Sequence, residues 1–228
     1  VGSEMCIRDR GDFRRPAVVM ETADGRMVNE LLYQSHEIVS GKPALTGLPS
    51  LDVDTGETAS LSVTLLDSAG GYEVVLHYSV FEKEDIIARH VEIRNVGKEG
   101  IWLREAASLS LDFERKDFTF LSLSGAWARE RQVSGRPLGQ GTTSIESRRG
   151  ASSHQLNPFA ALTDLSATET SGEVYGFALA YSGDFRIGAE VSQFGSTRLQ
   201  AGLNPETFSW YPVSYTHLRA HETLSELV

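Results

Sequence analysis

Regular alternation of apolar and polar side chains is the feature of this sequence that most limits its fold. In residues 72–81 (YEVVLHYSVF), every second position from Tyr72 to Val80 is apolar, and most positions between them are polar. Successive side chains of a β-strand point to opposite faces, so a period of two predicts a strand rather than a helix. Val75 and Phe81 interrupt the polar series, which indicates that the second face is also partly covered.

The same pattern recurs along most of the chain. Besides 72–81, strands are predicted at residues 17–21, 31–38, 61–67, 86–95, 101–107, 109–113, 118–124, 175–181, 185–191 and 197–203. Ser182, Gly183 and Asp184 supply turn residues between two of these segments, which predicts a hairpin that joins 175–181 to 185–191. No amphipathic helix of three turns is expected.

Strands of this kind are stable only when they pack against one another. Ordering about ten residues costs roughly 10–20 kcal/mol of backbone entropy, whereas burying four or five apolar side chains returns about 6–15 kcal/mol. An isolated hairpin therefore does not fold, but two stacked sheets bury their inner faces together. We expect an all-β fold, a large antiparallel β-sandwich (supersandwich), formed as one domain by residues 11–212.

The two ends of the chain share no pattern with this body. Residues 1–10 (VGSEMCIRDR) and 213–228 (VSYTHLRAHETLSELV) resemble peptides translated from sequencing-adapter read-through, so both are expected to be non-native flanks. His217 and His221 lie four residues apart, which would place them on one face of a helix and suit a metal ion. The pair lacks a third ligand and the helix would be a short, unsupported tail, so no metal site is predicted.

Charge and cysteine content restrict the partners of the protein. Acidic residues outnumber basic residues by 31 to 21, and the formal charge of −10 argues against a nucleic-acid partner. No apolar run approaches the roughly 20 residues that span a bilayer, so no membrane partner is expected. Cys6 is the only cysteine and no Asn-x-Ser/Thr acceptor occurs, which favours a cytoplasmic location.

Candidate catalytic residues are few, and each has a simpler structural interpretation. Sugar hydrolases need two carboxylates across the scissile bond, about 5–5.5 Å apart when configuration is retained. Residues 82–85 (EKED) are expected to form a solvated turn, and Asp112 and Glu114 a wet sheet face. Residues 152–154 (SSH) are too close in sequence to reach proton-transfer geometry. No catalytic residue, metal or cofactor is therefore predicted.

A long polar segment, residues 148–159 (RRGASSHQLNPF), is the loop with the strongest functional character. Loops carry binding residues more often than strands do. The expected interpretation is nevertheless a surface loop whose Ser, Asn and Gln side chains bond their own backbone. Its two arginines and those at 129, 131 and 136 are expected to be solvated.

A series of motifs extends through residues 11–212 in a fixed order. They are GDFR at 11–14 followed by Pro16 and Ala17, LTGLPS at 45–50, RHVEIRN at 89–95, GAWARER at 125–131, SSHQ and NPF within 152–159, GFALAYSG at 176–183 and WYP at 210–212. In these motifs the chain resembles the amino-terminal region of bacterial-type α-galactosidases of glycoside hydrolase family 36.

The resemblance implies a β-sandwich that precedes a (β/α)₈ barrel and a smaller carboxy-terminal β domain. It further implies hydrolysis of terminal α-galactosyl groups from oligosaccharides such as melibiose and raffinose, with retention, by two aspartates of the barrel. The matched region contains neither aspartate, so this chain is expected to be inactive alone. The alternative is a stand-alone carbohydrate-binding or adaptor β-sandwich, which the gene beyond Pro212 would distinguish.

The resemblance also implies roles for particular residues. Relatives of the bacterial type form homotetramers in which sandwich loops of one subunit border the active site of another. Arg14 is the candidate for such a contact with sugar hydroxyls, with Asp12 as an acceptor beside it; an ion pair that fixes the first strand is the equal alternative for Arg14. Trp127 could stack on galactose, but packing in the interior is the favoured interpretation.

Overall fold

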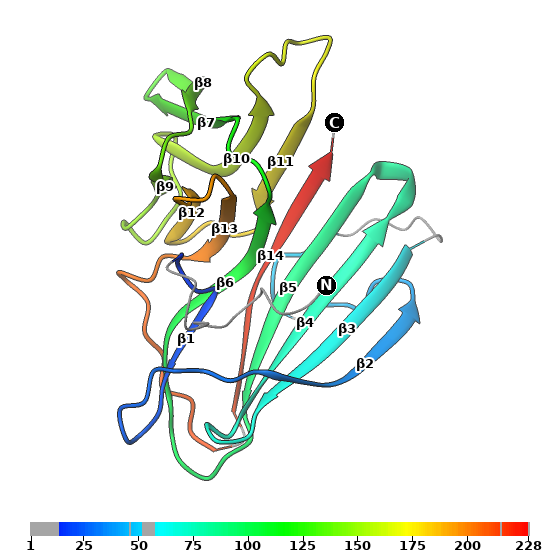
Figure 1. Ribbon diagram of the computed structural model, residues 1–228, viewed down its shortest axis with the longest axis vertical. Coiled ribbons are helices and arrows are strands. Elements are labelled where there is room, and N and C mark those ends of the chain that lie inside the picture. The colour runs from blue at the N-terminus through cyan, green and yellow to red at the C-terminus, as the bar shows by residue number, and fades with distance from the viewer. Residues whose placement is uncertain (1–13, 46, 52–57, 215, 228) are drawn as a thin grey trace.

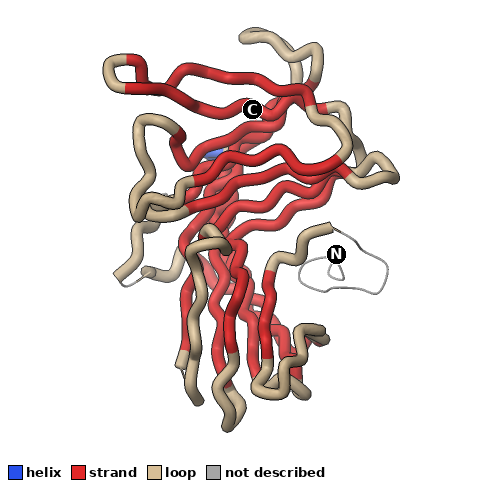
Figure 2. The backbone as a smooth tube through the Cα atoms, turned by 90° about the vertical axis from the view of Figure 1, so that its left-hand side faces the viewer, coloured by secondary structure: helices blue, strands red, loops and turns tan. Residues whose placement is uncertain are grey.

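Two stacked antiparallel sheets make up the fold, and the computed structural model describes residues 14–45, 47–51, 58–214 and 216–227 (Figure 1). The strands are β1 (Val18–Glu21), β2 (Leu32–Ser40), β3 (Thr58–Asp67), β4 (Tyr72–Phe81), β5 (Ile86–Asn95), β6 (Trp102–Phe113), β7 (Phe118–Ala126), β8 (Arg129–Pro137), β9 (Gly141–Glu146), β10 (Leu156–Asp164), β11 (Val174–Leu179), β12 (Phe185–Val191), β13 (Thr197–Leu203) and β14 (His217–Leu227). Within the described ranges the only helical element is the 3₁₀ turn η1 (Glu82–Glu84), and loops join the strands at their ends (Figure 2).

The two sheets differ in width. The smaller has five strands in the order β1-β6-β13-β12-β9, and the larger has nine in the order β2-β3-β4-β5-β14-β11-β10-β7-β8. This confirms the predicted all-β sandwich. The bounds of β4, β5, β12 and β13 are those predicted from alternation, whereas the segments predicted at 101–107 and 109–113 form the single strand β6. The strands β8, β9 and β10 were not predicted, because none of them shows clear alternation.

Alternating side chains fill two adjoining apolar clusters between the sheets. In β4 the predicted inner face begins with Tyr72, Val74 and Leu76, each at most 2% exposed, in the cluster nearer β1. The second cluster lies under β7, β10, β12 and β13 and includes Phe120 and Leu162, also buried. The clusters are typical of aligned sheets, whose inner side chains interdigitate.

The hairpin predicted around Ser182, Gly183 and Asp184 is wrong. β11 pairs with β10 and β14 in the larger sheet, and β12 pairs with β9 and β13 in the smaller one. The three turn residues therefore carry the chain from one sheet to the other. Turn chemistry fixes a change of direction but does not fix whether the two flanking strands pair, because that depends on the other strands available to each.

The helical interpretation of the carboxy-terminal segment is also wrong. Residues His217–Leu227 form β14, which lies between β5 and β11 in the larger sheet, with a register shift between Ala220 and Thr223. Pairing on both edges satisfies backbone groups that an isolated tail would expose to water. The non-native origin expected for residues 213–228 stays a prediction, and the flank expected at residues 1–10 lies outside the described residues.

Candidate functional site

Arg14, the candidate for a sugar contact, lies in a cluster of charges at the entry to β1. Its Nη1 is 3.2 Å from Asp112 Oδ1 and 3.4 Å from Ser196 Oγ. Arg198 holds both oxygens of the same carboxylate, with Nε and Nη2 each 2.7 Å away. Asp112 therefore lies between two guanidinium groups, so the predicted wet sheet face is wrong for Asp112. Glu114 is exposed, as predicted, but it follows the end of β6.

The next residue, Arg15, is held to the smaller sheet through its backbone as well as its side chain. Its N–H donates to Glu190 Oε2 over 2.9 Å, and its carbonyl accepts from Gln200 Nε2 over 3.0 Å. Its guanidinium forms an ion pair with Glu105. Burial raises the pKa of the Glu105 carboxyl, and the Arg15 guanidinium partly offsets that rise. These contacts fix the chain that leads into β1.

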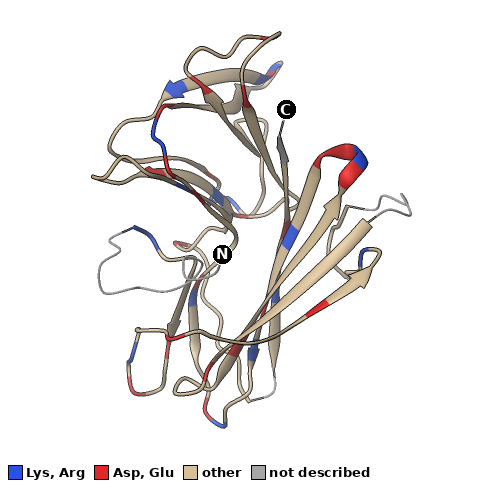
Figure 3. Cartoon of the chain, turned by 45° about the vertical axis from the view of Figure 1, so that its right-hand side comes forward, with Lys and Arg blue, Asp and Glu red and all other residues tan. Residues whose placement is uncertain are grey.

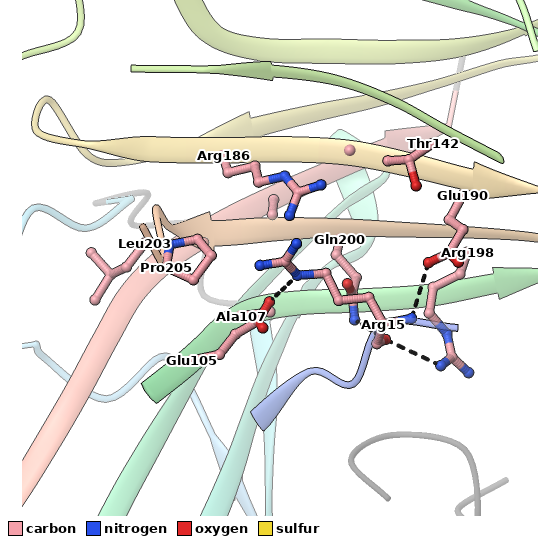
Figure 4. Close-up of a pocket in the computed structure, with 13 residues that line it drawn as sticks. Arg15, Glu105, Ala107, Thr142, Arg186, Glu190, Arg198, Gln200, Leu203 and Pro205 are labelled. Atoms are coloured by element: carbon pink, nitrogen blue, oxygen red, sulfur yellow. Dashed lines mark hydrogen bonds and ion pairs between the residues drawn. The ribbon is translucent and has the colours of Figure 1, made fainter. Parts of the chain in front are cut away.

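The side chains around Arg15 enclose a small pocket on the outer face of the smaller sheet (Figure 4). Arg186 of β12 and Arg198 of β13 line it together with Glu105 and Glu190. Its volume is about 30 Å³, whereas a pocket for a small ligand typically measures about 300–1,000 Å³. The space suits one or two water molecules and is too small for a sugar ring.

A larger pocket opens on the other side of Asp112. It measures about 270 Å³ and is lined mainly by apolar side chains, among them Phe113, Tyr175 and Phe177. The rings of Phe113 and Tyr175 meet edge to face with centroids 5.1 Å apart. Burial raises the pKa of Tyr175, and the nearby Glu173 carboxylate raises it further. This pocket has aromatic walls, and its rim carries the carboxylates of Asp85 and Asp112.

The two sugar-binding predictions near the amino terminus have different outcomes. The ion pair weighed as the alternative for Arg14 is present, with Asp112 as its partner. A sugar contact by Arg14 stays a prediction. Asp12 lies outside the described residues, and so do the Gly11 and Phe13 positions of the same motif.

Trp127 is exposed, so the prediction that it packs in the interior is wrong. The side chain is 85% exposed at the turn between β7 and β8. The turn is tight: Ala128 adopts the left-handed conformation, with φ 60°, and donates its N–H to Glu130 Oε1 over 3.0 Å. A Cβ at Gly125 would lie 2.4 Å from the Arg129 carbonyl oxygen, so only glycine fits beneath the turn.

The polar segment 148–159 lies beside this turn. Gly125 donates its N–H to the Gln155 carbonyl over 3.1 Å, and Leu156 begins β10. Within the loop, Ser153 Oγ accepts from the Gln155 N–H, as predicted, but residues 156–159 belong to β10, so the predicted loop is too long. Arg148 pairs with Glu206 over 2.6 Å. The sequence singled out this loop and the Trp127 turn separately, and the fold brings them together.

The remaining candidates form no catalytic or metal-binding group. Residues 82–84 form the η1 turn between β4 and β5, in agreement with the predicted solvated turn. His221 stacks on Tyr181 with ring centroids 3.9 Å apart, and burial lowers the pKa of that histidine. Among the described residues no three His, Cys, Asp or Glu side chains are arranged to hold a metal ion. No helix in the described part is long and apolar enough to cross a bilayer.

A polar cluster that the sequence did not reveal lies on the outer face of the larger sheet. His77 of β4 and His90 of β5 stack with centroids 4.3 Å apart, and His77 Nε2 is 3.8 Å from Glu92 Oε2. His90 is 9% exposed. Burial, with smaller contributions from His77 and Lys42, lowers its pKa to about 3. In sequence these residues appear only as polar positions of alternating strands.

Comparison with known proteins shows that the chain is similar to part of several alpha-galactosidases. It is 46% identical over 200 residues to alpha-galactosidase AgaA of Geobacillus stearothermophilus, a match that covers 87% of this chain and 27% of that protein. It is 42% identical to alpha-galactosidase Mel36A of Lactobacillus acidophilus over a similar span. The chain thus spans about a quarter of the length of the curated relatives it matches.

Solved structures give the same result for the fold. A variant of the GH36 alpha-galactosidase AgaA in complex with stachyose superposes with a TM-score of 0.95 at 41% identity, over 98% of this chain and 31% of that chain. The alpha-galactosidase of Lactobacillus brevis also gives 0.95, at 35% identity. The family described as the glycosyl hydrolase family 36 N-terminal domain matches residues 1–212. On this match, the chain belongs to the N-terminal domain family of the family 36 glycosyl hydrolases.

Proposed function

We propose that this chain is the non-catalytic amino-terminal part of an α-galactosidase that hydrolyses terminal α-galactosyl groups of oligosaccharides with retention. The observation that carries the proposal is the 46% identity to an α-galactosidase over 87% of this chain but only 27% of the relative. The two catalytic carboxylates are supplied by a (β/α)₈ barrel that belongs to the remainder of the full-length protein.

The carboxylates that contact Arg14 and Arg15 support a structural role for this part of the protein. Asp112 is bound by Arg14 and Arg198, and Glu105 is bound by Arg15. A retaining glycosidase needs one free nucleophilic carboxylate and one acid that face the same substrate pocket. Carboxylates that are already paired with arginine are poor candidates for either task. The arginine stabilises the ionised form, so the carboxylate is a weaker nucleophile and does not retain a proton that it could donate.

The domain supports the barrel, contributes to contacts between subunits and helps to close the galactoside pocket. The full-length protein is a cytoplasmic homotetramer, and its substrates are α-galactoside oligosaccharides. Arg14 and Asp12 are the residues of this chain proposed to border the galactoside. The single cysteine and the absence of Asn-x-Ser/Thr acceptors support the proposed location.

Hydrolysis of a nitrophenyl α-galactoside tests the proposal. The purified 228-residue chain is expected to release no nitrophenol. A chimera in which residues 14–212 replace the matching segment of the Geobacillus enzyme is expected to be active. Release of product by the chain alone would contradict the non-catalytic role. A folded chimera without activity would favour a stand-alone binding or adaptor module.

A further inference from the structure

One arginine in the small pocket on the outer face of the smaller sheet has no partner of opposite charge among the described residues. Arg186 lies on β12 between Phe185 and Ile187, which are both fully buried, so its side chain points to the outer face. The side chain is half-buried and lines the pocket shown in Figure 4. Within the part of the chain that the structure describes, its guanidinium forms no ion pair and no hydrogen bond. Because a guanidinium stays protonated in proteins, these residues leave its positive charge without a counter-charge.

The carboxylates around this arginine are bound to other donors. Glu146 lies opposite it in the register of β9 and β12, but Glu146 Oε1 is 3.4 Å from Arg148 Nε. The two glutamates of the pocket both contact Arg15 instead. Glu105 forms an ion pair with the Arg15 guanidinium, and Glu190 accepts the Arg15 backbone N–H over 2.9 Å. The fold therefore brings acidic groups to the same face without pairing any of them with this arginine.

The pocket has an excess of positive charge. Its lining includes three arginines and two glutamates, namely Arg15, Arg186, Arg198, Glu105 and Glu190. Asp112 also contacts Arg198, but it shares its carboxylate with Arg14. With these two residues added, the described part of the group has four positive and three negative charges. Figure 3 shows acidic and basic residues interspersed on the smaller sheet. The excess is local, since the whole chain has a formal charge of −10.

Two arginines of the pocket face the same space. Figure 4 shows the guanidinium groups of Arg15 and Arg186 on facing sides of it. Gly188 and Gly202 also line the pocket, so two positions beside Arg186 have no side chain to fill it. Gly202 lies opposite Arg186, and a Cβ there would lie 2.7 Å from the Ala106 carbonyl oxygen. Only glycine fits at that position, which keeps the floor of the pocket open.

A carboxylate group fits this space. The pocket has a volume of about 30 Å³, which holds one or two water molecules, and the two oxygens of a carboxylate take up similar room. The planar guanidinium presents its N–H groups as a fork that matches two carboxylate oxygens. Thr142, which also lines the pocket, adds a hydroxyl that can donate a further hydrogen bond. Partial burial strengthens such charge-assisted bonds, because water screens them less.

We propose that Arg186 and Arg15 bind a carboxylate group in this pocket. The group belongs either to a free small carboxylate or to an Asp or Glu side chain from outside this chain, and the chemistry of recognition is the same. The bound carboxylate lies between the two guanidinium groups, supplies the missing negative charge and accepts hydrogen bonds from the unused N–H groups of Arg186. The site follows from the charges of this chain and holds whether or not the proposed function is correct.

Titration of the 228-residue chain with sodium formate tests the site. Formate replaces sodium chloride at constant ionic strength, and the Arg186 Nε–H resonance is followed by NMR. We expect a saturable shift with a dissociation constant on the order of 1–10 mM, the range open to a ligand of about three heavy atoms. Arg186→Gln should weaken formate binding, read at the Arg15 Nε–H resonance, at least about tenfold.

Two further variants serve as controls. Arg136→Gln removes an exposed arginine of β8 in the larger sheet and should leave the affinity for formate unchanged. Arg186→Lys keeps the charge but loses the fork, so it should give an intermediate affinity, and it replaces the glutamine variant if that variant does not fold. No saturable shift up to about 100 mM formate, or equal affinity in the wild-type chain and Arg186→Gln, would overturn the site and leave water as the occupant.

Melting temperatures of the chimera described above identify the source of the carboxylate. If a free carboxylate is the ligand, formate should raise the melting temperature of both the chimera and the chain, and less so in Arg186→Gln. If an Asp or Glu of the longer protein occupies the site, formate should have no effect on the chimera. Arg186→Gln should then lower the melting temperature of the chimera, and Arg136→Gln should not.

Either of these results supports the site. A chimera whose melting temperature responds neither to formate nor to Arg186→Gln would overturn it, whatever its α-galactosidase activity. An inactive chimera that still responds would contradict only the proposed function.

Discussion

The stacked histidines on the outer face of the larger sheet make the stability of this protein depend on pH. His90 stacks on His77, and the charges of Lys42, Glu92 and Arg219 also act on it. Burial lowers the pKa of His90 to about 3, with His77 and Lys42 adding to the effect. The folded protein therefore keeps His90 neutral at pH values at which the unfolded chain protonates it.

The sign and size of the effect follow from proton linkage. A histidine whose folded pKa is depressed contributes stability above its unfolded pKa, near 6.5, and that contribution is lost as the pH falls toward the folded value. Between pH 7.5 and pH 5 the unfolded chain gains nearly one proton at this site and the folded protein gains almost none. At about 1.4 kcal/mol per pH unit, the unfolding free energy is expected to fall by about 2 kcal/mol.

Urea unfolding at the two pH values measures this difference, with His90→Phe as the comparison. Phenylalanine retains an aromatic ring against His77 but cannot titrate. The wild-type chain is expected to lose about 2 kcal/mol more than the variant between pH 7.5 and pH 5. The pKa of Glu92 is lowered by the neighbouring His77 and by Arg94, so its contribution to stability is lost only at lower pH, and Glu92 is present in both proteins. Equal pH dependence in the two proteins would refute the reasoning.

Three further changes test the packing and the charge cluster. Phe120→Ala removes a side chain that is 1% exposed and should cost about 3–5 kcal/mol of unfolding free energy in urea, whereas Phe194→Ala, at an 84% exposed position, should change it by at most about 0.5 kcal/mol. Asp112→Ala removes the Asp112 carboxylate from the Arg198 guanidinium, which is 4% exposed, and should cost about 3–5 kcal/mol in the same assay; a loss below about 1 kcal/mol would show that the cluster is screened by water. Gly125→Ala forces a Cβ to within 2.4 Å of a backbone oxygen, so faster proteolysis between β7 and β8 is expected, and an unchanged cleavage rate would contradict the close approach.

The strands were predictable because their causes are local. Tyr72–Phe81, Ile86–Asn95 and Phe185–Val191 have the bounds that alternation and turn residues predict. In such a segment, the polarity of each residue indicates whether its side chain points to the core or to the solvent. The all-β sandwich follows from the number of such segments and from the energy of burying their inner faces.

The site was predictable only in part. The motif that contains Arg14 correctly identified one segment of the charge cluster. The partners of Arg14 are distant in sequence: Asp112 lies 98 residues away and Ser196 lies 182 residues away. No local pattern connects residues so far apart. For the same reason the exposure of Trp127 was missed, because a tryptophan between apolar residues is buried only if another element comes to cover it.

The sequence by itself determined that this protein is built of strands, where most of them begin and end, and which family it belongs to. Tertiary structure alone decided that β11 and β12 belong to different sheets, that the carboxy-terminal segment enters the larger sheet as β14, and that Asp112 lies between two arginines. The physical reason is that alternation and turn chemistry act within a few residues, whereas strand pairing and charge pairing are choices among partners from the whole chain.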